Sequence, residues 1–105
     1  MKRLFVEVLA GDVVIGTANL VPADPSMGVA FAVFQPRSAY AVDRHASAFE
    51  QCERNESAER LRARTADGFQ LDCAGIDLLD FAETLGSEGR ELHVLGLERF
   101  QTFFD

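Results

Sequence analysis

Apolar and polar residues alternate near the N-terminus in the pattern of β-strands. Residues 3–9 are rich in β-branched and aromatic types, and a second apolar run follows at residues 13–15. Gly11-Asp12 lies between them with the composition of a two-residue hairpin loop, in which glycine supplies the positive φ. Gly16 then falls inside the second strand, where glycine indicates a bulge or a close backbone approach. The predicted cross-strand pairs are Val8 with Ile15 and Leu9 with Val14.

Three prolines shape residues 20–36. They exclude a helix, or a central strand, from the first half of this segment. Asp24-Pro25-Ser26-Met27 has the residues of a type I turn, because aspartate accepts backbone N–H bonds and proline presets φ. After Gly28, the run Val29–Phe34 is apolar on both alternating faces, which predicts a central strand that ends at Pro36.

The next periodic segment has helical spacing. Val42, Ala46, Phe49 and Cys52 recur at intervals of three or four residues, and charged residues lie mostly on the opposite side. This pattern predicts the main helix over residues 39–54.

A second hairpin is predicted around Ala66-Asp67-Gly68. A three-residue loop with Gly68 in the left-handed position keeps apolar residues on one face and polar residues on the other. A two-residue loop would set Leu71 opposite Arg64 and mix the two classes. The predicted pairs are Thr65 with Phe69, Ala63 with Leu71, Arg64 with Gln70, and Arg62 with Asp72 as an ion pair.

The last third predicts a short helix, a strand and an aromatic end. Asp77 can cap a helix that Gly86 stops, and residues 92–97 have the composition of a last strand. The chain then carries three phenylalanines that either cover the core or form a dimer contact, and we favour the cover. These three residues are Phe100, Phe103 and Phe104. The fold class expected is therefore α+β: a mostly antiparallel sheet of about five to six strands, with one main helix and one short helix.

Length and composition predict a single domain over residues 1–105. The chain is 48% hydrophobic and 26% charged, which is ordinary for a globular protein with its own core. Two cysteines, Cys52 and Cys73, are too few for a secreted disulfide framework, so we expect both to be reduced. We recognise no signal-peptide run and no apolar stretch of membrane-spanning length, and expect a cytoplasmic protein.

Charge is unevenly distributed along the chain. The net charge is −7, and residues 65–105 hold nine acidic and two basic side chains. Such a surface repels phosphate backbones, so nucleic-acid binding is not expected. A basic protein partner is permitted, although an acidic surface also serves solubility.

Candidate chemical groups have ordinary structural explanations. The histidines and cysteines lack the close spacing of a zinc site, so no metal or catalytic cysteine is expected. The carboxylates of Asp77, Asp80 and Glu83 are explained by helix capping and first-turn charge. The arginines at positions 60, 62 and 64 form a row that protects an edge strand. No glycine-rich phosphate loop occurs, so no nucleotide or other cofactor is expected.

The most distinctive stretch resembles one in small bacterial proteins of unassigned role. It comprises Ile15-Gly16, Leu20, the run from Asp24 to Ala30, Phe34, Pro36 and Tyr40. The resemblance covers about a quarter of the chain and implies no activity. Physically, the stretch projects a turn between buried strands, where ligand contacts often lie. The candidate binding residues are Asp24, Ser26, Met27, Arg37 and Tyr40, and a purely architectural turn is the alternative.

Three functions compete on this evidence. The first is a non-enzymatic binding or regulatory module that recognises a basic protein through the acidic last third, as an immunity-like protein or antagonist would. The second is a small enzyme or ligand-binding protein with a pocket beside the Asp24–Gly28 turn. The third is a structural homodimer assembled through the three late phenylalanines.

Overall fold

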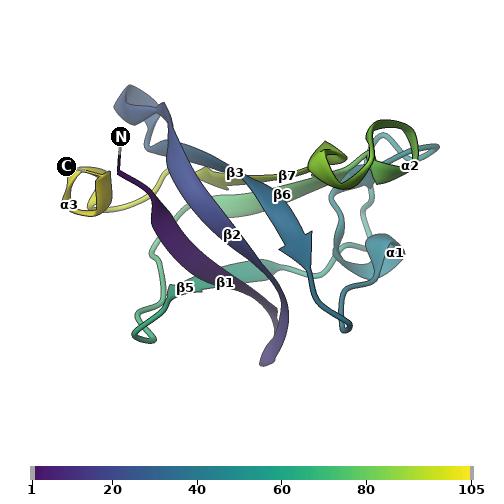
Figure 1. The fold of residues 1–105 in the computed structure, drawn as a ribbon, viewed down its shortest axis with the longest axis horizontal. Helices are drawn as coiled ribbons and strands as arrows, with labels where there is room; N and C mark the ends of the chain where they lie inside the picture. The colour runs from purple at the N-terminus through teal and green to yellow at the C-terminus, as the bar shows by residue number, and fades with distance from the viewer. Residues whose placement is uncertain (1, 105) are drawn as a thin grey trace.

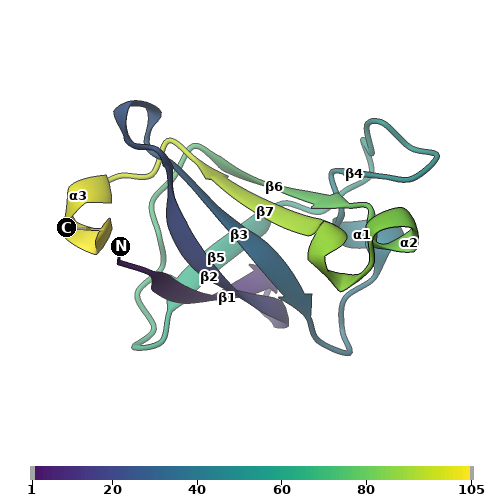
Figure 2. The same ribbon diagram turned by 45° about the horizontal axis from the view of Figure 1, so that its top comes forward.

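A computed structural model describes residues 2–104 as a curled half-barrel made almost entirely of sheet (Figures 1 and 2). Its seven strands lie in the order β4-β6-β7-β3-β2-β1-β5, and all neighbours are antiparallel except β4 and β6. The strands are β1 (Leu4–Ala10), β2 (Val13–Asp24), β3 (Val29–Pro36), β4 (Ala48–Phe49), β5 (Leu61–Thr65), β6 (Gly75–Asp80) and β7 (Arg90–Leu95). The helices are α1 (Val42–His45), α2 (Ala82–Leu85) and α3 (Phe100–Phe104), with single 3-10 turns η1 (Pro25–Met27) and η2 (Ser87–Gly89). The expected sheet of five to six antiparallel strands with one main helix is wrong.

The first hairpin confirms both properties predicted for Gly16. Leu9 pairs with Val14 as expected, but a bulge next to Leu9 sets Val8 opposite Gly16 instead of Ile15. A Cβ on Gly16 would lie 2.3 Å from the Cζ atom of Phe34, so β2 and β3 approach closely at this point. Glycine is required there by space and not by an unusual φ.

Strand β2 continues through a proline that the sequence pattern treats as a barrier. Pro22 pairs with Ala30 on β3, inside a strand that lies in the middle of the sheet. The carbonyl of Ile15 on β2 accepts the amide of Arg37, which follows β3. Successive residues of an antiparallel strand direct their backbone polar groups to opposite neighbours, so the backbone nitrogen of Pro22 points away from β3. On that other side, the pairing with β1 ends at Leu20. Pro22 therefore lacks an N–H at a position where no neighbouring strand would accept it. The prediction was wrong because the residues around Pro22 do not indicate where β1 ends.

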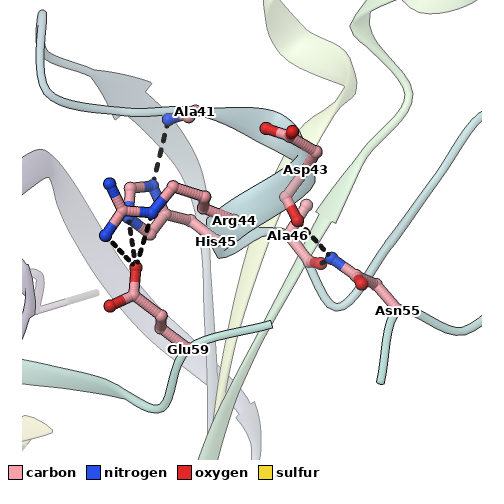
Figure 3. Close-up of polar contacts among 7 residues, drawn as sticks. All are labelled: Ala41, Asp43, Arg44, His45, Ala46, Asn55 and Glu59. Atoms are coloured by element: carbon pink, nitrogen blue, oxygen red, sulfur yellow. Dashed lines mark hydrogen bonds and ion pairs between the residues drawn. The ribbon is translucent and has the colours of Figure 1, made fainter. Parts of the chain in front are cut away.

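The predicted main helix over residues 39–54 is also wrong. Helix α1 has four residues, and the chain then becomes extended and adds β4 beside β6. In a longer helix the amide of Ser47 would donate to the carbonyl of Asp43. Here that amide donates to the carbonyl of Leu78 at 2.7 Å, and the side-chain amide of Asn55 donates to the Asp43 carbonyl at 2.9 Å (Figure 3). Partners distant in sequence thus replace the helical hydrogen bonds.

The second hairpin has the predicted loop and register. Gly68 has φ of 90°, its amide donates to the carbonyl of Thr65, and the amide of Leu71 donates to the carbonyl of Ala63. The predicted ion pair between Arg62 and Asp72 is absent. Arg62 instead contacts the carboxylate of Asp12 at 3.6 Å and the side chain of Gln70, because it extends over the convex face toward the first hairpin.

Residues 75–80 form β6 where a helix capped by Asp77 was expected. Ile76 and Leu78 alternate with Asp77, and they face Val94 and Leu92 across β7. The helix starts later, at α2, and ends before Gly86 as predicted.

The core fills the concave side of the curled sheet. Eight large side chains are fully buried there: Phe34, Ile15, Leu20, Leu78, Leu92, Val6, Val8 and Val94. Helix α3 covers one end, where Phe100 is buried and Phe103 and Phe104 pack against the core. The predicted aromatic cover is therefore confirmed, whereas the homodimer remains a prediction. None of the helices within residues 2–104 has the length and apolar character needed to cross a membrane.

Candidate functional site

A cleft of about 540 Å³ opens at the end of the half-barrel where α1 and α2 lie. Figures 1 and 2 both place these helices together at the end opposite α3. The turn that follows β4 and the ends of β6 and β7 complete the walls. The lining residues are Tyr40, Val42, Phe49, Glu50, Gln51, Asp80, Ala82, Glu83 and Arg90.

Asp80 is a buried carboxylate at the base of this cleft. It is the last residue of β6, pairs with Arg90 of β7, and is 6% exposed. One oxygen, Oδ2, accepts the hydroxyl of Tyr40 at 2.5 Å and the Nε–H of Arg90 at 3.3 Å. The other, Oδ1, accepts the amide of Ala82 at 3.0 Å at the start of α2. Three donors of the protein itself therefore hold the charge, so Asp80 ties the two strands, α2 and Tyr40 together.

Tyr40 forms a half-buried aromatic wall of the cleft. Its ring stacks on His45 at a centroid distance of 5.8 Å and meets the edge of Phe34 at 5.2 Å. Burial raises the pKa of Tyr40 far above its usual range, and the neighbouring carboxylate of Asp80 raises it further. The phenol therefore keeps its proton at neutral pH and acts as a hydrogen-bond donor, not as a base.

A second polar network holds α1 in place (Figure 3). The Nδ1 atom of the buried His45 accepts the amide of Ala41 at 3.0 Å, so the ring proton of the neutral histidine lies on Nε2. Nε2 lies 3.2 Å from Oε2 of Glu59, and Arg44 lies 2.9 Å from the same oxygen. The segment around Glu59 is thereby attached to α1. Because His45 stacks on the ring of Tyr40, the same network also fixes the position of that ring.

The rim of the cleft is acidic. Glu50 accepts the amide of Thr84 at 2.9 Å, which links the turn after β4 to α2. Glu83 is exposed in the first turn of α2. The lining as a whole contains three carboxylates, of Glu50, Asp80 and Glu83, against the single guanidinium of Arg90. Because Arg90 is occupied by Asp80, the accessible charge at the rim is negative and lies next to the aromatic surfaces of Tyr40 and Phe49.

The five residues singled out from the sequence do not form one site. Tyr40 lines the cleft, but Arg37 lies on the convex face, where it pairs with Glu7 at 3.5 Å. Asp24, Ser26 and Met27 lie at the other end of β3, which spans roughly 25 Å over its eight residues.

Within that turn the hydroxyl of Ser26 donates to Asp24 at 2.7 Å, and Met27 is 67% exposed. A ligand at the turn would therefore contact neither Arg37 nor Tyr40.

The acidic last third is also distributed over several surfaces. Asp80 and Glu83 belong to the cleft. Asp77 and Glu91 occupy the convex face, since they pair with His93 and Leu79 in the register opposite to the core. Glu98 lies beyond β7, where its amide donates to the carbonyl of Asp72. Among the described residues the acidic run is therefore divided between surfaces, and in the cleft two of its members lie beside the aromatic rings of Tyr40 and Phe49.

The sequence carries no signal that the main cleft residues meet. Tyr40 was a candidate binding residue and Asp80 one of the carboxylates considered, but they are forty residues apart and no motif pairs them. The expected helix capped by Asp77, with Asp80 in its first turn, is wrong, because both residues belong to β6; Asp80 instead accepts the amide of Ala82 at the start of α2. The contribution of His45 was not predicted, because its partner Glu59 lies outside the predicted long helix.

The described part of the chain contains no group of three or more histidine, cysteine, aspartate or glutamate side chains arranged to hold a metal ion. Burial raises the pKa of the Cys73 thiol, which opposes formation of a reactive thiolate. Comparison of the chain with protein-family models, with curated proteins and with solved structures finds no match. A functional argument therefore depends on the chemistry of the cleft.

Proposed function

We propose that this protein is a binding module that recognises a basic protein partner by accepting a lysine or arginine side chain in the cleft. The observation that carries the proposal is the meeting of the Glu50 and Glu83 carboxylates with aromatic rings in one cavity of about 540 Å³. The carboxylate of Glu50 accepts the amide of Thr84, the residue that follows Glu83 on α2, so a cation at this rim would be near both charges. A cation over the face of a tyrosine or phenylalanine gains a further ~0.5–2 kcal/mol.

The overall charge supports the same class of partner. A net charge of −7 attracts a basic protein over long distances and accelerates its association, with an effect that salt weakens. The cleft would then select the contact at short range. An antagonist that neutralises a basic target would combine these two properties.

The arrangement of Asp80 favours binding over acid–base catalysis. A catalytic carboxylate needs a free oxygen that can exchange a proton with a substrate. Both oxygens of Asp80 already accept protein donors, and the raised pKa of Tyr40 keeps that hydroxyl protonated. These groups form the frame of the cleft, and the rim carboxylates supply the recognition.

The direct test measures binding of a labelled arginine- and lysine-rich peptide by fluorescence anisotropy, with an acidic peptide of equal length as the ligand control. The cleft variant combines Glu50→Gln with Glu83→Gln, because glutamine at position 50 can still accept the amide of Thr84. We expect its affinity for the basic peptide to fall about tenfold, which corresponds to about 1.4 kcal/mol.

The matched control combines Asp72→Asn with Glu98→Gln, which removes the same charge beyond the opposite end of the sheet. Its affinity should stay within about twofold of the original protein at physiological salt. Equal weakening of both variants would show that bulk charge alone binds the peptide, and lack of binding by the unmodified protein would refute the proposal. Capture from native lysate with these two variants would then identify the partner.

A further inference from the structure

A second cavity, of about 550 Å³, lies at the opposite end of the molecule between the start of β1, the second hairpin and α3. Most of its surface is apolar. Phe5 and Phe69 are 43% and 42% exposed, and the ring of Phe69 meets that of Phe103 at a centroid distance of 6.1 Å. The lining residues are Leu4, Phe5, Thr65, Ala66, Asp67, Phe69, Arg99, Thr102 and Phe103. Exposed aromatic rings gathered around a concavity of this size are typical of a ligand site.

The charge balance at this end differs from that of the acidic cleft, because the lining holds one basic and one acidic side chain. Arg99 belongs to the lining, and the exposed Lys2 and Arg3 directly precede the lining residue Leu4. Figures 1 and 2 both show the beginning of β1 on the side of the molecule where α3 lies. The acid in the lining, Asp67, accepts the hydroxyl of Thr65 within the hairpin loop. The apolar groove therefore has one guanidinium, that of Arg99, in its lining, and two further cations lie next to Leu4 in the chain.

We infer that this groove binds a long-chain carboxylate, with the hydrocarbon chain against Phe5, Phe69 and Phe103 and the carboxylate at Arg99. An apolar chain removes the exposed aromatic surface from water, and each methylene that becomes buried tightens binding further. The guanidinium of Arg99 supplies a planar pair of donors that matches a carboxylate. This function is independent of the acidic cleft at the other end of the sheet.

The test uses decanoate as the anionic probe and decanol as its neutral analogue, both below micelle-forming concentrations. Binding is measured by calorimetry and located by the chemical shifts of backbone amides. Decanoate should shift the amides of residues 65–69 and 99–103, and it should bind more tightly than decanol. Arg99→Gln should weaken decanoate about two- to fivefold and leave decanol unchanged. Arg54→Gln, which removes an exposed arginine near the other end, is the matched control.

A second variant keeps the inference testable if the first alters the fold. Phe69→Ala truncates an exposed ring at the groove and should weaken both probes severalfold, with an unchanged far-ultraviolet spectrum. Absence of shifts at the groove, equal affinity for the two probes, or an unaltered decanoate affinity in Arg99→Gln would each overturn the inference. So would sedimentation showing that two copies associate through Phe103 and that decanoate does not separate them.

Discussion

Replacing Tyr40 by phenylalanine removes the hydroxyl that donates to the buried carboxylate of Asp80 and leaves the ring contacts unchanged. The bond is 2.5 Å long and has an ionised acceptor. Hydrogen bonds to charged groups contribute about 1.5–3 kcal/mol, so we expect Tyr40→Phe to lower the free energy of unfolding by about 2 kcal/mol at pH 7. For a chain of this size that loss moves the urea midpoint down by on the order of 1 M.

The difference between the two proteins should shrink at alkaline pH. The folded state raises the pKa of Tyr40 above the value of about 10 that tyrosine has in an unfolded chain. The stabilisation linked to this proton is therefore complete below pH ~10 and is lost as pH rises from there toward the folded-state pKa. The slope for one proton is about 1.4 kcal/mol per pH unit, so the advantage of the unmodified protein should fall to well under 1 kcal/mol near pH ~11.

The ionisation of Tyr40 can be measured directly by absorbance. The chain has one tyrosine and no tryptophan, so the tyrosinate absorbance of the folded protein reports Tyr40 alone. Urea unfolding at several pH values, followed by circular dichroism, supplies the free energies for both proteins. Phenolate formation near pH ~10 in the folded protein, or equal urea midpoints at pH 7, would refute the assignment of Tyr40 as a buried donor.

Three further substitutions test the architecture by urea unfolding. Gly16→Ala should destabilise the protein by more than about 2 kcal/mol, because the new Cβ would lie 2.3 Å from a ring carbon of Phe34 on β3. The control Gly75→Ala places its Cβ where no atom lies within 4 Å, so it should change stability by less than about 1 kcal/mol. Equal effects would contradict the close approach. Asn55→Ala removes two side-chain hydrogen bonds to carbonyls of the α1 segment and should cost about 1–3 kcal/mol, so an unchanged midpoint would show that these bonds do not hold the segment. Leu78→Ala should lower the free energy of unfolding by about 2–5 kcal/mol, because the Leu78 side chain is fully buried. The control Leu85→Ala truncates a side chain that is 65% exposed and should change the free energy of unfolding by less than about 1 kcal/mol. The reverse order would mean that the core is misassigned.

The hairpins were predictable because the residues that determine each loop and register lie within about ten positions of one another. In the second hairpin only a three-residue loop keeps polar and apolar faces separate, and the structure has that loop with Gly68 in the left-handed region. In the first, Gly16 inside a strand indicated a bulge or a close backbone approach, and the structure has a bulge beside it and a close approach to β3. The aromatic residues of α3 likewise indicated the cover that they form over the core.

The predicted helix over residues 39–54 failed because its competitor is distant in sequence. The periodicity of Val42, Ala46, Phe49 and Cys52 is real, but helical spacing determines only which residues could share a face. The amide of Ser47 finds the carbonyl of Leu78, and Asn55 satisfies the carbonyls that a longer helix would have used. Propensity differences are a few tenths of a kcal/mol per residue, so such tertiary contacts decide the outcome.

What the sequence by itself determined is therefore local: strand alternation, the two hairpin loops, the aromatic end and the acidic charge. What only the tertiary structure decided is which of these elements meet. The cleft exists because the end of β6 lies beside β7 and α1, which brings Asp80, Arg90 and Tyr40 within hydrogen-bond distance across forty residues of chain. No local pattern encodes such a meeting, since the carboxylate gains its donors and loses its water only when the sheet curls around the core.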